Sequence, residues 1–134
     1  MEELHKNIGK NLGIEPGIRK RIVGITASNY TPPSNPHQLK EQAEKILSIT
    51  NKTTQPYSKA LLALALIPYL QAYEDGNKRT GRMLANALLL ALVGRGFSLR
   101  KTDARSLATA YLSFYEISSL QSLDSINLLI SANE

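Results

Sequence analysis

The sequence predicts an all-α fold, and three observations support this. Two long apolar runs, residues 61–70 and 83–93, follow each other closely and have the length of buried helices. A third segment, residues 36–50, carries apolar residues at helical spacing. β-Branched residues gather only within residues 18–30. We therefore expect a helical bundle with one small β-hairpin.

The helix expected over residues 36–50 has a clear start. Asn35 can accept a backbone N–H bond as the cap, and Pro36 suits the first helical position. The apolar positions that form one face are Leu39, Ala43, Ile46 and Leu47. This pattern is typical of a surface helix that buries one side.

The next two helices, residues 56–71 and 78–94, are apolar nearly all round. Helices of that kind are buried against other helices, so we expect them to form the core pair. Pro68 should bend or loosen the last turn of the first, and Gly94 should end the second.

Two shorter helices are expected at residues 103–116 and 120–131, the former capped by Thr102. The hairpin over residues 18–30 would turn around Gly24 and end before Pro32. A lone hairpin on a helical body leaves an open strand edge.

The composition limits the class of protein. The 134 residues fit a single domain spanning residues 1–134, and the absence of cysteine excludes disulfides and a thiolate metal site. The N-terminus has no signal-peptide h-region, and both apolar runs are shorter than the roughly 20 residues of a membrane span. A cytoplasmic protein without a membrane partner is expected, and the formation of a homo-oligomer is left open. The net charge of +5 suits a phosphate-bearing partner, but no basic run with interleaved aromatic residues indicates nucleic acid.

The segment QAYEDGNKRTGR, residues 71–82, has the pattern of a phosphate-binding loop before a helix. Asp75 can bind a hard cation, Gly76 permits a tight turn, and Asn77 can cap the next helix. The first turns of that helix carry three cations, Lys78, Arg79 and Arg82. Cations oppose the positive end of a helix dipole, so their presence there indicates an anion site rather than a stability device.

These residues resemble the motif of the Fic (filamentation induced by cAMP) family, written His-Pro-Phe-x-Asp/Glu-Gly-Asn-Gly/Lys-Arg-x-x-Arg. The match runs from Tyr73 to Arg82 without a gap. The upstream segment GIRKRIVGITASNYTPP also resembles the β-hairpin flap of that family. The resemblance covers residues 17 to about 116 and implies a Fic-type helical bundle.

The resemblance implies transfer of AMP from ATP to a hydroxyl of a target protein. By the same resemblance Asp75 holds Mg²⁺ on the phosphates, Arg79 binds the β- and γ-phosphates, and Arg82 reaches the terminal phosphate. The residues assigned to the nucleotide are Gly76, Asn77, Lys78, Arg79 and Arg82. From the residues alone, Gly76 could also belong to a plain helix–helix turn. Arg82 could likewise form an ion pair with Asp75 or Glu74.

The flap, residues 18–30, would by this resemblance hold an unknown target protein by adding the target's chain to the hairpin edge. The flap residues assigned to this contact are Ile25, Thr26, Asn29 and Tyr30. Thr26, Asn29 and Tyr30 are explained equally well as ordinary hairpin and turn residues.

Gln71 stands where the family has the histidine that takes the proton from the attacking hydroxyl. A glutamine amide cannot accept that proton as a general base, and the loss of such a base typically costs about 10²–10⁴ in rate. His5 and His37 are expected to be solvated, and Glu74 is expected to be solvated as well. Two hypotheses follow: a Fic-type transferase with weak or altered catalysis, or a nucleotide- or protein-binding pseudoenzyme.

Overall fold

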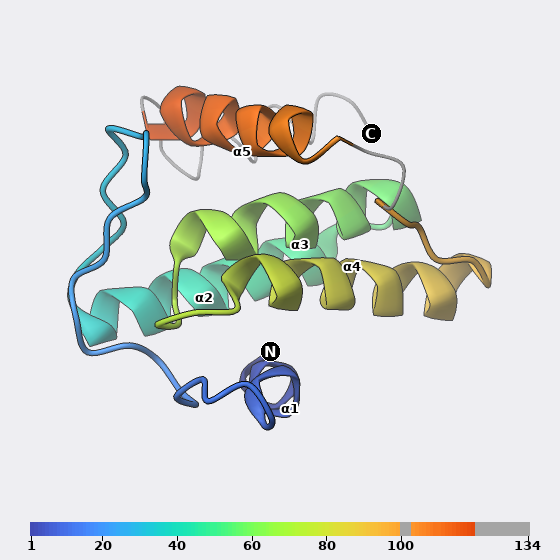
Figure 1. Cartoon of the computed structure of the whole chain (residues 1–134). Coiled ribbons are helices and arrows are strands. Elements are labelled where there is room, and N and C mark those ends of the chain that lie inside the picture. Colours follow the sequence, from blue (N-terminus) through green and yellow to red (C-terminus); the bar gives the residue numbers. More distant parts are fainter. Residues whose placement is uncertain (100–102, 120–134) are drawn as a thin grey trace. The chain divides into compact units, whose positions relative to one another are not determined.

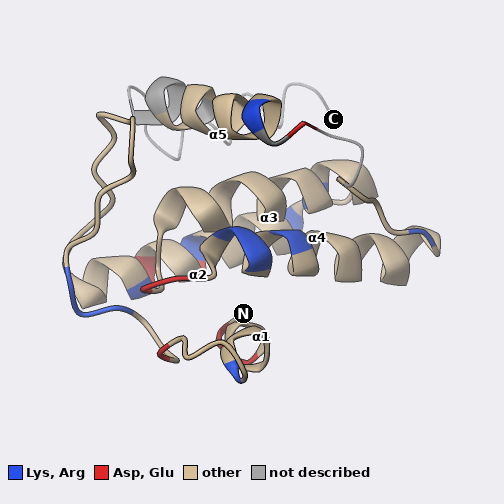
Figure 2. Ribbon diagram, viewed as in Figure 1, with Lys and Arg blue, Asp and Glu red and all other residues tan. Residues whose placement is uncertain are grey.

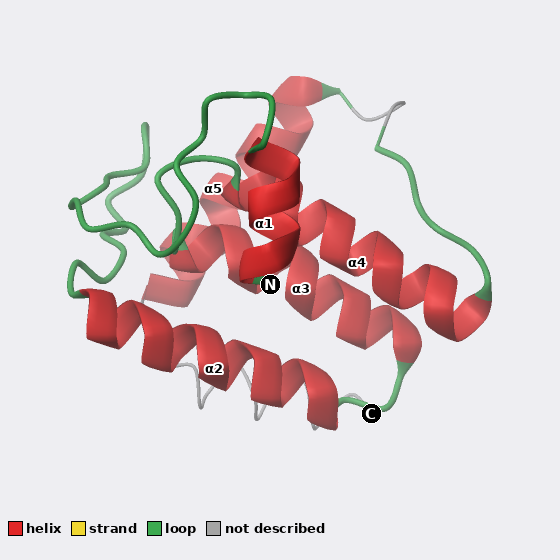
Figure 3. Ribbon diagram, turned by 90° about the horizontal axis from the view of Figure 1, so that it is seen from below, coloured by secondary structure: helices red, strands yellow, loops and turns green. Residues whose placement is uncertain are grey.

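The computed structural model describes residues 1–99 and 103–119, and within them it has five helices and no strand (Figures 1 and 3). The all-α prediction is confirmed. The chain divides into two compact units: Met1–Val23 with Pro32–Gly96, and Gly24–Thr31 with the described residues from Phe97 onward. The single domain expected over residues 1–134 stays a prediction. None of the helices in the described ranges combines the length and apolar character that crossing a bilayer requires.

The first unit contains α1 (Glu2–Gly9), α2 (Pro36–Lys52), α3 (Pro56–Leu70) and α4 (Asn77–Val93). Helix α3 packs against both α2 and α4, and α1 packs against α4 (Figure 3). The most apolar helix therefore lies between two others, which cover much of its apolar surface. Helix α1 was not foreseen from the sequence.

Helix α2 begins as its sequence predicts. The Asn35 side chain accepts a 2.8 Å hydrogen bond from the His37 backbone N–H, and Pro36 takes the first helical position. The residues of α2 that are buried are Leu39, Ala43, Ile46 and Thr50. Their spacing of three and four residues forms the single face that meets α3.

Helices α3 and α4 approach closely where Gly81 faces Pro68. A Cβ atom added at Gly81 would lie 3.0 Å from Pro68 Cδ and 3.1 Å from the Ala63 carbonyl oxygen. Pro68 lies inside α3, is buried, and is followed by two more helical residues before the helix ends. The proline is thus part of the contact between the two helices.

The prediction that α3 and α4 are buried all round is wrong for their outer faces. Tyr57 and Leu61 of α3 are exposed, as are Met83, Leu90 and Leu92 of α4. Helix α4 packs chiefly against α3 and α1, and these apolar side chains lie outside those contacts.

The second unit contains α5 (Ala104–Ser119). Its cap is Asp103, whose side chain accepts a 3.0 Å hydrogen bond from the Ser106 backbone N–H. That bond also lowers the pKa of Asp103, because it favours the ionised carboxylate. The cap predicted at Thr102 is therefore replaced by Asp103, and Thr102 and the helix expected over residues 120–131 lie outside the described residues.

The hairpin expected over residues 18–30 is not present, because this segment forms no strand. Arg19 is buried and its guanidinium donates hydrogen bonds to the carbonyl oxygens of Arg21 and Pro33, which fixes the chain as an irregular loop. The chain also passes from one compact unit to the other after Val23. A tight turn at residues 25–28 remains, with a 3.1 Å bond from Ser28 N–H to the Ile25 carbonyl oxygen.

Candidate functional site

Residues 71–76 form the loop between α3 and α4, which we call the α3–α4 loop. The residue at each end of this loop has a left-handed backbone conformation. Gln71 ends α3 with φ 51° and ψ 47°, and Gly76 precedes α4 with φ 81° and ψ 5°. These two conformations reverse the chain within six residues, so that α4 packs back along α3.

Asn77 holds the inner side of the loop together. Its Oδ1 accepts a 3.0 Å bond from the Tyr73 backbone N–H, and its Nδ2 donates a 2.9 Å bond to the Tyr73 carbonyl oxygen. The Asn77 side chain is buried, and within the described ranges no side chain caps the start of α4. The prediction that Asn77 caps this helix is therefore wrong, because its amide satisfies the buried Tyr73 backbone instead.

The Gln71 side chain is bound within the same loop. Its Nε2 donates a 2.6 Å bond to the Pro68 carbonyl oxygen, and its Oε1 accepts a 3.3 Å bond from Asn77 Nδ2. Both polar ends of the amide thus have protein partners. The side chain helps to shape the loop and does not present a proton acceptor to a reacting group.

The outer side of the loop carries the charges. Asp75, Lys78 and Arg79 are exposed and Arg82 is half-buried. Figure 2 shows these cations on the first turns of α4, directly after the acidic residues of the loop. The structure therefore places an exposed acid in the loop and exposed cations on the first turn of the next helix, where an anion is favoured.

A known protein family matches the part of the chain that contains this loop. The model of the Fic/DOC family matches residues 1–89, which is more than half of the chain. The chain belongs to the Fic/DOC family. The match includes α1, α2, α3, the α3–α4 loop and most of α4.

A curated relative of this Fic/DOC-family chain comes from Aquifex aeolicus (strain VF5) and is named a probable protein adenylyltransferase. It is 27% identical over 89 residues, which cover 65% of this chain and 28% of the relative. This chain therefore corresponds to less than a third of the relative's length.

Asp75 is the metal-ligand candidate in the loop of this Fic/DOC-family chain. Its Oδ1 accepts a 2.5 Å bond from the Gly76 N–H, and the side chain is exposed. Within the described residues no group of three or more histidine, cysteine, aspartate or glutamate side chains could hold a metal ion. One carboxylate alone fits Mg²⁺, which is commonly bound by one or two carboxylates together with substrate phosphates.

Arg19 supports the loop from the segment before α2. Its backbone N–H donates a 2.9 Å bond to the Ala72 carbonyl oxygen, and its Nε donates to the Gln71 carbonyl oxygen. The residue is 2% exposed. Sequence reasoning missed this role, because one arginine in the cationic stretch Arg19 to Arg21 carries no signal that it is buried.

His5 supports the loop from α1. Its ring is fully buried, stacks on Tyr73 and donates from Nε2 to the Asp75 carbonyl oxygen at 2.8 Å. The prediction that His5 is solvated is therefore wrong. Leu4 and Ile8, four residues apart, could have indicated a short helix here. Nothing in the sequence indicated a contact 70 residues away.

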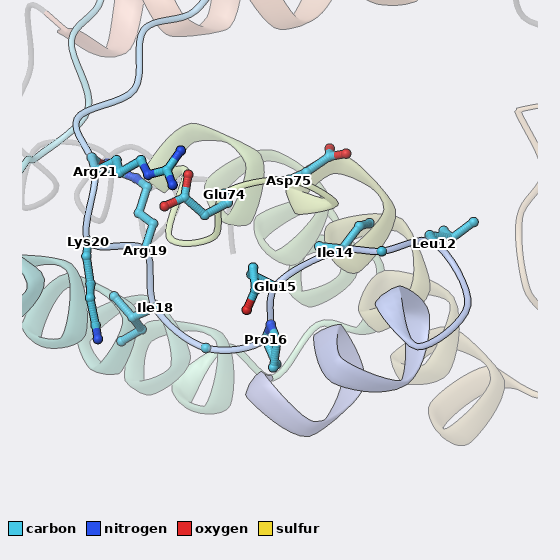
Figure 4. A pocket seen from close by; sticks show the side chains of 12 residues that line it. Leu12, Ile14, Glu15, Pro16, Ile18, Arg19, Lys20, Arg21, Glu74 and Asp75 are labelled. Carbon is cyan, nitrogen blue, oxygen red and sulfur yellow. The ribbon is translucent and has the colours of Figure 1, made fainter.

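A cavity of about 470 Å³ lies between residues 12–21 and the acidic pair of the loop (Figure 4). Glu74 points toward Arg21, whereas the Asp75 carboxylate points away from it (Figure 4). The charged side chains that line the cavity have both signs. Its walls thus do not select a ligand by charge alone.

The predicted flap residues lie in the second compact unit, whereas the α3–α4 loop lies in the first. Thr26 and Asn29 are exposed and Ile25 is half-buried. Tyr30 is buried, with its ring centroid 6.0 Å from that of Tyr115. The described residues provide no strand edge here, and target binding by this segment stays a prediction.

Proposed function

We propose that this chain binds ATP with Mg²⁺ at the α3–α4 loop and that any transfer of AMP to a protein hydroxyl is weak. The observation that carries the proposal is the division of the loop. Asp75 of the loop and Arg79 of the first turn of α4 are exposed, while the amide of Gln71 is bound within the protein. The family and the name of the relative support AMP transfer as the reaction.

In the binding step, Asp75 would hold Mg²⁺, which when bound neutralises phosphate charge. Arg79 would bind the β- and γ-phosphates and Arg82 the terminal phosphate, with Lys78 beside them. The backbone at Asn77 and the start of α4 would receive phosphate oxygens, because no side chain of the described residues caps this helix, whereas the Gly76 N–H already donates to Asp75. Positioning and charge neutralisation are the main requirements of such chemistry.

In the transfer step, the hydroxyl oxygen of the target attacks the α-phosphorus of ATP. The bond between the α-phosphorus and the oxygen that bridges it to the β-phosphorus breaks, and pyrophosphate leaves. The hydroxyl proton must go to an acceptor. Gln71 cannot take it, and its Oε1 already accepts from Asn77. We therefore expect a rate about 10²–10⁴ below that of a protein with a histidine at this position.

Calorimetric titration with ATP and Mg²⁺ tests the binding step. The native chain should bind, and Arg79→Ala should weaken binding by about tenfold or more, as expected for loss of a charged hydrogen bond. Arg95→Ala is the matched control, because Arg95 is an exposed cation just beyond the other end of α4. No heat of binding at millimolar ATP would contradict the proposal.

Labelling of a cell extract with radioactive ATP tests the transfer step. Gln71→His should increase the transfer of label to protein, because an imidazole can accept the hydroxyl proton. Histidine also tolerates the left-handed backbone conformation of this position, so the loop should keep its shape. Strong labelling by the native chain that Arg79→Ala abolishes would show an efficient transferase and overturn the claim of weak catalysis.

A binding module without transfer activity is the second candidate. The observation that favours it is the engagement of both ends of the Gln71 amide inside the loop. It predicts that Gln71→His also fails to transfer label while ATP still binds.

A further inference from the structure

We propose that His5 of α1 is a positioning residue for the α3–α4 loop, and that it holds the Asp75–Gly76 peptide in the orientation that aims Asp75 at a ligand. The effect of His5 on the binding of Mg²⁺ and ATP rests on the proposed function. Its effect on the conformation of the loop does not depend on that function.

The His5 side chain is held at two points. Its ring stacks on Tyr73 with a centroid distance of 3.7 Å and an interplanar angle of 7°. Its Nε2 lies 2.8 Å from the Asp75 carbonyl oxygen, and a carbonyl can only accept, so Nε2 carries the proton. Stacking fixes the plane of the imidazole, and the hydrogen bond directs its edge at one peptide of the loop.

That peptide leads directly to the Asp75 carboxylate. The Asp75 carbonyl and the Gly76 N–H belong to one planar trans unit, so they point in opposite directions. With the carbonyl turned inward to His5, the Gly76 N–H turns outward, where it donates to Asp75 Oδ1 at 2.5 Å. His5 thus determines the position of the carboxylate through a single peptide plane.

Gly76 is suited to this contact. It has φ 81°, which side chains disfavour, and an added Cβ would lie 3.4 Å from His5 Nε2. That separation is an ordinary van der Waals contact, so a glycine here is explained by the backbone conformation of the turn.

A purely structural role explains His5 less well. Its Nδ1 is buried and has no hydrogen-bond partner in the described part of the chain. An apolar side chain could stack on Tyr73 without burying an unpartnered nitrogen, which costs free energy. The histidine is therefore explained by the bond that its other nitrogen makes to the loop.

Three variants separate positioning from packing. His5→Phe keeps a ring for Tyr73 but cannot donate to Asp75, whereas His5→Gln keeps an N–H donor without the ring. Tyr73→Phe keeps the stack and the donor, and serves as the matched control. His5→Leu replaces His5→Phe if the latter does not fold.

Amide hydrogen exchange by NMR is the first measurement. His5→Phe should speed exchange at Tyr73 and Gly76 about tenfold relative to Leu66 in α3, since one buried hydrogen bond is lost. His5→Gln should restore exchange to within about threefold of the native rate, and Tyr73→Phe should leave it unchanged. Equal acceleration at Leu66, or no change in the loop, would overturn the proposal.

ATP titration with Mg²⁺ is the second measurement. The affinity of His5→Phe for ATP should fall by about the same factor as its amide exchange in the loop rises. His5→Gln should bind ATP with an affinity close to that of the native chain. If the native chain does not bind ATP, the proposed function fails, while the exchange rates still decide the role of His5. Native affinity in a His5→Phe variant with accelerated loop exchange would show that His5 does not position the site.

Discussion

The inner and outer sides of the α3–α4 loop contrast in what their polar groups contact. On the inner side, Asn77 and Tyr73 are buried and joined by two hydrogen bonds between the Asn77 amide and the Tyr73 backbone. On the outer side, Asp75 and Arg79 are exposed. The inner residues maintain the shape of the loop and the outer residues remain accessible to a ligand. Stability and binding should therefore respond to different substitutions.

Asn77→Ala should have the largest effect on stability. It leaves the buried N–H and carbonyl of Tyr73 without partners, and each such group costs about 1–3 kcal/mol. We expect the free energy of unfolding to fall by about 2–4 kcal/mol, as measured by urea denaturation.

Asn77→Asp tests whether the donor matters as well as the acceptor. An ionised aspartate can accept from the Tyr73 N–H but cannot donate to its carbonyl oxygen. The free energy of unfolding of Asn77→Asp should lie between that of the native chain and that of Asn77→Ala. A native value for Asn77→Ala would contradict the structural role of the inner side.

Gly81→Ala should have the next largest effect. The added Cβ meets the Pro68 ring at 3.0 Å and a backbone carbonyl at 3.1 Å, and neither is the end of a flexible side chain. Overpacking costs about 1–3 kcal/mol, whereas the better helix propensity of alanine returns about 1 kcal/mol. A net loss of up to about 2 kcal/mol is expected in thermal or urea unfolding.

The matched control is Gly24→Ala, where a Cβ meets nothing within 4 Å and φ is not positive. It should leave stability within about 0.5 kcal/mol of the native value. Equal losses for the two variants would show that the close approach of α3 and α4 is not the cause.

Tyr73→Phe should change the pH dependence of stability. Burial, with a smaller contribution from Glu2, raises the pKa of the Tyr73 phenol above its ordinary value of 10.0. Since the unfolded chain ionises first, the contribution of this group is complete below pH 10 and is lost as the pH rises beyond it.

We therefore expect the stability of the native chain to fall above about pH 10 and that of Tyr73→Phe to fall less. The measurement is urea unfolding from pH 8 to pH 11, with the exposed Tyr57→Phe as the control. At pH 7 the Tyr73 variant should be within about 1 kcal/mol of the native chain, because the phenol oxygen is buried and has no hydrogen-bond partner among the described residues. Identical slopes for the native chain and both variants would refute this.

Arg79→Ala should have the smallest effect on stability, within about 0.5 kcal/mol, because the side chain is exposed on the outer side. Thermal unfolding without ligand measures it. The same variant should lose the stabilisation that ATP and Mg²⁺ give the native chain. A large loss of stability without ligand would place Arg79 among the residues that hold the loop.

The helices of the first unit were predicted from the sequence with different success. Helices α2, α3 and α4 begin and end within about two residues of the expected positions, because caps and apolar spacing are local signals. Helix α1 is short and mostly polar, and was missed. The hairpin was predicted from β-branched residues, but a strand needs a partner, and the buried Arg19 fixes this segment differently.

The candidate site shows the same division. The motif residues from Asp75 to Arg82 stand where the sequence placed them, on the loop and the first turns of one helix. The role of Asn77 as a cap was wrong, because a buried backbone competes for its amide. His5 was assigned to solvent because its local sequence is polar.

The sequence by itself determined helices α2, α3 and α4, the α3–α4 loop, the charges beside it and the absence of a histidine at Gln71. These are properties of neighbouring residues, which propensity, caps and motif spacing can predict. Only the tertiary structure decided that His5 and Arg19 are buried against the loop, and that the Gln71 amide is bound within it. The contacts of His5 and Arg19 join residues 52 to 70 positions apart, and they depend on how whole helices pack.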